Sequence, residues 1–145
     1  MKKQAILVSA CLLGVCCRYD GASKPNGDVI KLREKYVLIP ICPEVDGGLP
    51  TPRTPSERVG DKVLMRDGKD VTENYRRGAE LALAKAKDFG CDTALLKARS
   101  PSCGKGKIYD GSFSGTLTDR DGVCAELLMK SGITVLTEDE IEKLL

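Results

Sequence analysis

The chain has 145 residues, of which 41% are hydrophobic and 30% charged, and its net charge is +2. This composition is typical of one globular domain, residues 1–145. The small net charge gives no general attraction to nucleic acid or to a membrane surface, and no stretch approaches the roughly 20 apolar residues of a membrane span. Histidine is absent, which excludes Ser–His and Cys–His nucleophiles and histidine-bound metals.

Seven cysteines are present, an odd number at irregular spacing. This pattern does not match a secreted disulfide scaffold. The first residues superficially resemble a lipoprotein signal ending at Cys11, but the apolar run 5–8 is shorter than the roughly 7–15 residues that an export signal needs. We therefore expect a cytoplasmic protein with free thiols and no membrane association.

Three apolar runs share one layout, in which a buried strand is followed by a cysteine and a glycine-containing loop. Runs that are apolar on both faces predict central strands of a parallel sheet. The runs and their cysteines are 5–9 with Cys11, 36–41 with Cys42, and 91–97 with Cys103.

Helical patterns separate these strands. A short helix is expected at 28–35, and a long helix is expected to begin at Asp70, with Glu73 closing a capping box, and to end at Gly90. Further helices at 122–130 and 138–145 flank a last strand at 133–136, and Thr137 with Glu140 forms a second capping box. Residues 104–121 are expected to form a polar, glycine-rich loop.

Turn dipeptides within residues 56–72 predict a β-hairpin or small meander. The alternation of strands and helices elsewhere predicts right-handed βαβ units. The fold class that follows is α/β, a small three-layer Rossmann-like parallel sheet with helices on both faces and the hairpin as an insertion.

Ligands of such sheets bind outside the carboxyl ends of the strands. We therefore expect Cys11, Cys42 and Cys103 to lie on one rim and to face a common cavity. Three thiolates suit a soft metal or an iron–sulfur cluster, and a set of three leaves one position open, as in catalytic sites. The alternative is that the three cysteines are small buried hydrophobic residues.

Several polar residues accompany these cysteines. Glu44 follows Cys42 by two positions, and an extended segment before and across Pro43 would turn both side chains to the same side. Ser9, Ser100 and Ser102 are further candidates for hydrogen bonding and proton transfer.

The remaining cysteines and an arginine leave alternatives open. Cys16 and Cys17 are adjacent and cannot easily face one centre, so either is a fourth ligand or a packing residue. Cys91 and Cys124 are expected to pack in the core. Arg53 either binds a ligand's oxygens or pairs with Glu44.

Five segments carry a resemblance to a known family: VSACLLG (8–14), CRYDG (17–21), CPEVDGGLPTPR (42–53), KARSPSCG (97–104) and IYDGSFSG (108–115). In this order they resemble the signatures of a bacterial family long catalogued as domain of unknown function 523, which includes thiouracil desulfidases. The resemblance spans almost the whole chain.

The resemblance implies a [4Fe-4S] cluster held by Cys11, Cys42 and Cys103, with an open iron that binds the sulfur of a thiocarbonyl substrate. It also implies that Glu44 shuttles a proton and that Ser100 or Ser102 positions substrate or water. The expected activity is removal of sulfur from a thiouracil-like small molecule without net redox change. The alternative is a non-enzymatic metal or iron–sulfur binding domain that serves sulfur metabolism.

Overall fold

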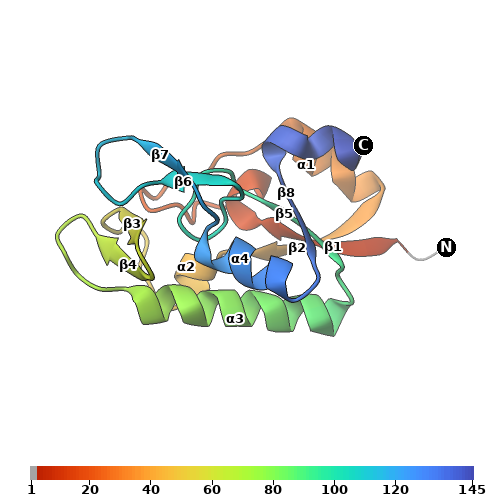
Figure 1. Ribbon diagram of the computed structural model, residues 1–145. Helices are drawn as coiled ribbons and strands as arrows, with labels where there is room; N and C mark the ends of the chain where they lie inside the picture. The colour runs from red at the N-terminus through yellow and green to blue at the C-terminus, as the bar shows by residue number, and fades with distance from the viewer. Residues whose placement is uncertain (1–2) are drawn as a thin grey trace.

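The structure is a computed structural model and describes residues 3–145. Its centre is a four-stranded sheet in the order β2-β1-β5-β8, in which every neighbouring pair is parallel (Figure 1). The strands are β1 (Gln4–Ser9), β2 (Tyr36–Ile41), β5 (Thr93–Leu96) and β8 (Thr134–Thr137). The four parallel strands confirm the predicted sheet.

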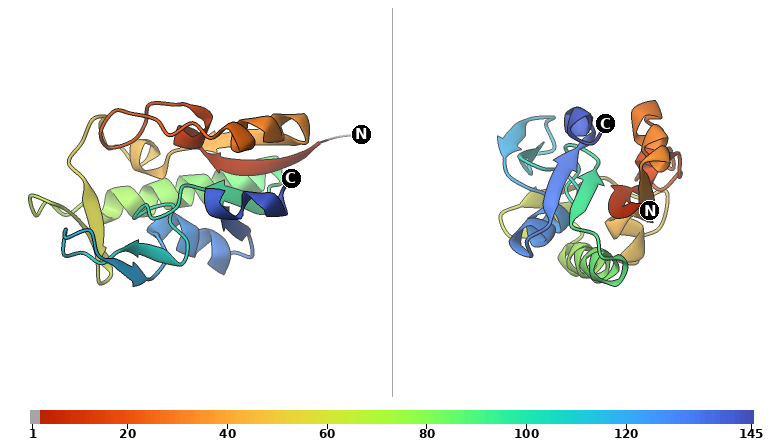
Figure 2. Two further views of the ribbon diagram at one scale, coloured as in Figure 1. Left: turned by 90° about the horizontal axis from the view of Figure 1, so that it is seen from above. Right: turned by 90° about the vertical axis from the view of Figure 1, so that its right-hand side faces the viewer.

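Helices cover both faces of this sheet, as the end-on view in Figure 2 shows. Alternate side chains of β1 enter the two cores: Leu7 packs on one face, and Ile6 and Val8 on the other, all without solvent exposure. The first core contains α3 (Thr72–Phe89) and α4 (Val123–Lys130); the second contains α1 (Gly27–Lys31) and the 3₁₀ helices η2 (Leu32–Glu34) and η3 (Glu138–Lys143). The three-layer α/β prediction is confirmed.

Within residues 3–145, no helix is long and apolar enough to cross a membrane.

The chain adds strands first on one side of β1 and then on the other. From β1 the chain passes along one face to β2, and it later returns through α3 to β5 on the other side of β1. The connection after β5 then continues through α4, which lies on the same face of the sheet as α3 and on the opposite face from α1. Loops that leave β1 and β5 toward opposite faces open a crevice at their carboxyl ends, the usual ligand position in such sheets.

Two antiparallel hairpins lie beyond this carboxyl edge, away from both termini (Figure 1). The first joins β3 (Ser56–Val59) to β4 (Lys62–Met65) and confirms the predicted insertion. The second joins β6 (Lys107–Tyr109) to β7 (Leu117–Asp119), where we expected only a polar loop. Strands of three residues are too short to show a clear alternation of apolar and polar positions, which explains why the sequence did not reveal them.

The helix ends agree with the sequence in part. The capping box of Thr137 and Glu140 is present, although the terminal helix is 3₁₀ rather than α. The box predicted for Asp70 and Glu73 is wrong, because Val71 is the N-cap residue of α3. The Asp70 carboxylate instead accepts from the Thr72 amide, while Glu73 pairs with an arginine on the helix surface.

A short helix, α2 (Pro43–Asp46), follows β2 and presses against α3. A Cβ atom at Gly78 would lie 1.8 Å from the Pro43 carbonyl oxygen, and one at Gly47 would lie 2.0 Å from the Asn74 carbonyl oxygen. Because Pro43–Asp46 form a helix, the expectation of an extended segment through Glu44 is wrong. Pro43 sits in the first turn of the helix, where its missing N–H costs nothing.

We expect Gly78→Ala to lower the free energy of unfolding by roughly 1–3 kcal/mol, because the methyl group has no space beside the Pro43 carbonyl. The measurement is urea denaturation. Gly27→Ala is the matched control, since it also lies in a helix but meets no atom within 4 Å. Equal midpoints for the two variants would contradict the close contact of α2 and α3.

Candidate active site

A cavity of about 620 Å³ opens at the carboxyl ends of β1, β2 and β5. Cys11, Cys42 and Cys103 all line it, so their predicted convergence on one rim is confirmed. Glu44, Ser100 and Ser102 line the same cavity. These three cysteines, the glutamate and the two serines therefore border one space.

The backbone fixes each of the three cysteines by a different local device. Cys11 lies in the 3₁₀ helix η1 (Ala10–Leu13), whose last turn is closed by Gly14 at a φ of 97°. Cys42 caps α2, and its amide donates to the Asp46 carboxylate at 3.2 Å. Cys103 lies in a tight turn in which its amide donates to Ser100 Oγ at 3.1 Å. Cys11 and Cys103 are buried, and Cys42 is half-buried.

The three thiols fit an iron–sulfur cluster better than a single ion. Within residues 3–145, no three side chains among the Cys, Asp and Glu are arranged to hold one metal ion. A cubane presents separate irons at its corners, so its ligands surround a volume and need not meet at one point. Burial raises the pKa of Cys103 to about 12. A thiol in this state binds metal as thiolate and releases its proton on doing so.

A fourth cysteine, Cys17, also lines the cavity. Its carbonyl oxygen accepts from Cys42 Sγ at 3.7 Å, and a hydrogen bond with Cys11 raises the pKa of its thiol to about 11. Its neighbour Cys16 is exposed. Because Cys16 and Cys17 are adjacent, the sequence indicated that the two side chains would not both face the site. It did not indicate which of the two would do so.

Cys91 and Cys124 are core residues, as predicted. Both are buried in the layer between the sheet and the helices α3 and α4, and neither borders the cavity. Burial raises the pKa of both thiols. They are therefore inert packing groups in the sense that a neutral, enclosed thiol is a poor nucleophile.

Glu44 is held at both carboxylate oxygens. Arg53 Nε donates to Oε1 at 3.2 Å, and Ser102 Oγ donates to Oε2 at 3.0 Å. The Arg53 side chain is only 3% exposed, and its Nη2 donates to the Cys17 carbonyl at 2.9 Å. Of the two roles considered for Arg53, the structure shows the pairing with Glu44.

The two candidate serines form a chain that ends at this carboxylate. Ser102 Oγ lies 2.9 Å from Ser100 Oγ. Because Ser102 has one hydroxyl proton and directs it to the charged carboxylate, Ser100 is the donor in the serine pair. Ser102 Oγ also lies 3.6 Å from Cys103 Sγ. Ser102 thus touches both a candidate ligand and the candidate proton acceptor, while Ser100 acts one step further away.

Ser9 and Tyr75 complete the inner wall. Ser9 Oγ accepts from the Lys97 amide at 2.9 Å, which joins the ends of β1 and β5. Tyr75 is 1% exposed, and its hydroxyl has no hydrogen-bond partner among the described residues. Burial, followed by the charge of Glu44, raises its pKa well above the usual value. Sequence reasoning missed Tyr75 as a cavity residue because it matched the apolar face of the long helix.

Comparison with known proteins agrees with this geometry. The sequence model of the 2-thiouracil desulfurase family matches residues 6–140. The chain belongs to this family. It is 41% identical over 150 residues to the uncharacterised protein YbbK of Bacillus subtilis (strain 168), an alignment that covers 97% of this chain and 99% of YbbK.

A solved structure gives the three-dimensional comparison. The [4Fe-4S]-dependent thiouracil desulfidase TudS is 47% identical, with a TM-score of 0.93 over 98% of this chain and 95% of that one. The sheet, the covering helices and the hairpins therefore form one architecture with TudS.

We expect Arg53→Ala to lower the free energy of unfolding by at most about 3–5 kcal/mol, because it leaves the partly buried Glu44 carboxylate without its cation. Denaturation in urea measures the change. Arg76→Ala is the control: it breaks an exposed pair with Glu73 and should cost at most about 0.5 kcal/mol. Similar losses for both variants would show that the Arg53 pair is not a structural element of the site.

Proposed function

We propose that this protein is a [4Fe-4S]-dependent desulfidase that replaces the sulfur of a thiolated pyrimidine, such as 2-thiouracil, by oxygen from water. One observation carries the proposal: a doubly hydrogen-bonded carboxylate, Glu44, borders the same cavity as three cysteine thiols. The identity of 47% to a [4Fe-4S]-dependent thiouracil desulfidase supports the same activity.

Cys11, Cys42 and Cys103 hold the cluster in this proposal. When bound, a cluster with three protein ligands supplies an open iron, a Lewis acid with affinity for the sulfur of a thiocarbonyl group. The three thiols come from the loops after β1, β2 and β5 and line one cavity, so the substrate would meet the cluster in that cavity. The buried surroundings of Cys11 and Cys103 limit the access of solvent to the site.

The reaction exchanges one atom. Water adds its oxygen to the thiocarbonyl carbon, the carbon–sulfur bond breaks, and the products are the carbonyl compound and hydrogen sulfide, with no net transfer of electrons. Glu44 accepts a proton from the attacking water and returns it to the leaving sulfur. Arg53 and Ser102 hold the carboxylate in place for both transfers. Ser100 orients the Ser102 hydroxyl.

The second candidate function is a non-enzymatic iron–sulfur binding domain. The Glu44 arrangement disfavours it, because burying a carboxylate beside a metal site has a desolvation cost that storage or structural support does not require. The discriminating experiment adds 2-thiouracil to anaerobically purified, iron-loaded protein. Catalytic release of sulfide with formation of uracil supports the desulfidase, and iron-loaded protein without sulfide release supports the binding domain.

We also propose that the protein acts in the cytoplasm on a free small molecule rather than on nucleic acid. All seven cysteines are unpaired thiols in the structure, which suits a reducing compartment. The net charge of +2 offers little general attraction for a polyanion.

We expect Cys11→Ser, Cys42→Ser and Cys103→Ser to lose most of their iron, because each removes one of three proposed ligands. Cys17→Ser should keep it, although Cys17 borders the same cavity. Iron and acid-labile sulfide per protein, measured after anaerobic reconstitution, test this. Cys124→Ala is the core control, with normal iron content and a modest loss of stability. Iron loss in Cys17→Ser or Cys124→Ala would show that the ligand set is wrongly assigned.

We expect Glu44→Gln to reduce the turnover of 2-thiouracil by about 10²–10⁴-fold, because the amide keeps the shape of the side chain and removes the proton acceptor. Iron content and affinity for 2-thiouracil should stay near the wild-type values. All three quantities are measured on one anaerobic preparation. Near-normal turnover would exclude the catalytic role, and loss of the cluster would show that Glu44 is structural.

The two serines provide a graded comparison. Ser102→Ala removes the hydrogen bond to Glu44 and should lower kcat by roughly 10–100-fold, the usual effect of losing a hydrogen bond to a charged group. Ser100→Ala should have a smaller effect, since Ser100 reaches Glu44 only through Ser102. The reverse order would indicate that Ser100 contacts the reacting molecule directly.

A further inference from the structure

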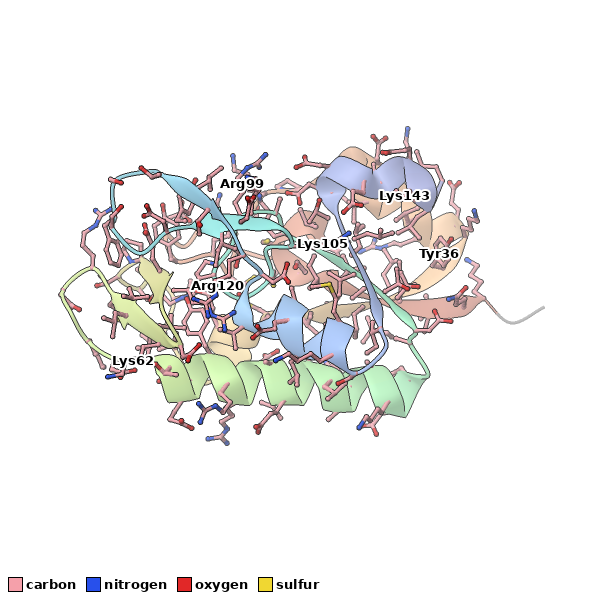
Figure 3. The ribbon with its side chains drawn as sticks, in the orientation of Figure 1. Tyr36, Lys62, Arg99, Lys105, Arg120 and Lys143 are labelled. Carbon is pink, nitrogen blue, oxygen red and sulfur yellow. The ribbon has the colours of Figure 1, made fainter. Side chains whose placement is uncertain are left out.

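The aromatic residues of the chain are few and unevenly placed. The sequence has four tyrosines, two phenylalanines and no tryptophan, and four of these six residues border the cavity: Tyr19, Tyr75, Tyr109 and Phe113. Of the remaining two, Phe89 is exposed on α3. Tyr36 donates from its hydroxyl to the Leu144 carbonyl at 3.3 Å, and it lies at the end of the molecule remote from Lys62 on the β3–β4 hairpin (Figure 3). Most of the few aromatic residues of this chain therefore lie around the cavity of the candidate active site.

Phe113 stands out among the four because of its backbone. It lies in the turn between β6 and β7 at a φ of 55°, in the left-handed region that residues other than glycine rarely adopt. Such conformations persist where the surroundings fix them, and they are concentrated at ligand sites. The half-buried ring borders the cavity from the hairpin side, whereas the cysteines and Glu44 border it from the sheet.

A buried carboxylate holds this turn in place. Glu57 on β3 is 9% exposed, and its Oε1 accepts from the amides of Gly111 at 3.0 Å and Phe113 at 3.1 Å. The turn also approaches β3 closely, because a Cβ at Gly111 would lie 2.8 Å from the Arg58 carbonyl oxygen. The position of Phe113 is therefore set by the neighbouring hairpin, before any ligand arrives.

The ring already accepts a planar cation. The guanidinium carbon of Arg66 lies 5.8 Å from the centre of the Phe113 ring, within the range of a cation–π contact. Arg66 borders the same cavity as Phe113, so the guanidinium and the ring together line one part of its wall. An aromatic side chain and a planar guanidinium at a cavity wall can both stack a flat heteroaromatic molecule.

We propose that Phe113 is the stacking residue that holds the ring of the thiolated base and thereby selects flat heteroaromatic substrates for this site. The proposal deepens the proposed function and rests on it. The sheet side of the cavity supplies the reacting groups, and Phe113 supplies affinity for the part of the substrate that does not react. Because stacking depends on the π-face and not on particular ring substituents, affinity follows the ring, with or without sulfur.

The experiment compares four variants of the iron-loaded protein. Phe113→Leu and Phe113→Met remove the ring but keep an apolar side chain, Phe113→Tyr keeps the ring, and Phe89→Leu is the matched substitution away from the cavity. The KM and kcat for 2-thiouracil are measured, together with the Kd for uracil, which has the same ring without sulfur. Both ring-less Phe113 variants should raise the KM and the uracil Kd by about ten-fold, with unchanged iron content and kcat. Phe113→Tyr and Phe89→Leu should match the wild type.

Three results would overturn the proposal. The first is a KM and a uracil Kd within two-fold of the wild type in both ring-less variants. The second is an equal loss in Phe113→Tyr, which would indicate the shape of the turn rather than stacking. The third is a loss confined to one of the two ligands, since both carry the same ring. A wild-type protein that binds uracil but releases no sulfide from 2-thiouracil would refute the proposed function alone, and the uracil Kd would still decide the role of Phe113.

Discussion

The ion pair between the enclosed Arg53 side chain and the partly buried Glu44 is the contact on which the site depends. Arg53 is almost fully enclosed, and its guanidinium reaches Glu44, the Cys17 carbonyl and the Pro50 carbonyl. Its backbone amide also donates to the Tyr19 carbonyl. One side chain therefore joins the loop after β1, the helix α2 and the proline-rich segment behind α2. An ion pair that is largely withdrawn from water stabilises only when both charges remain hydrogen-bonded, and here they are.

The two glycines between α2 and α3 make that pair possible. Gly47 and Gly78 remove the side chains that would otherwise separate the backbones of the two helices. The side-chain Nδ2 of Asn74 then donates to the Gly47 carbonyl at 2.9 Å and satisfies the end of α2. The long, well-packed helix α3 thus acts as a rigid support for a helix of only four residues, which could not hold its shape alone.

The sequence predicted those parts of the molecule that follow from regular patterns. Apolar runs gave the strands, and parallel strands place their carboxyl ends together, so the meeting of Cys11, Cys42 and Cys103 followed from topology alone. The hairpin at 56–72 followed from its turn residues.

The parts that the sequence did not reveal depend on contacts between distant segments. Helix α2 forms because α3 accepts it, not because four residues favour a helix. Tyr75 lines the cavity because of the packing of α3, and Phe113 lines it because its amide donates a hydrogen bond to the distant Glu57. Neither cause produces a pattern in the neighbouring sequence. The Glu44 prediction reached the right cavity for the wrong reason, since the segment is helical and not extended.

The two hairpins are structurally separate from the sheet that carries the cysteines, and this separation affects which parts of the molecule can vary in sequence. They contribute no strand to the central sheet, and polar side chains of β3 help to anchor them. Glu57 accepts from the backbone amides of the β6–β7 turn, and Arg58 donates to the Asp121 carbonyl and to Glu126 on α4. Residues in their turns can therefore change without disturbing the strands that carry the cysteines. Proteins with this fold can therefore evolve a different ligand preference through the hairpin turns while the cysteine site, and the reaction that depends on it, stays the same.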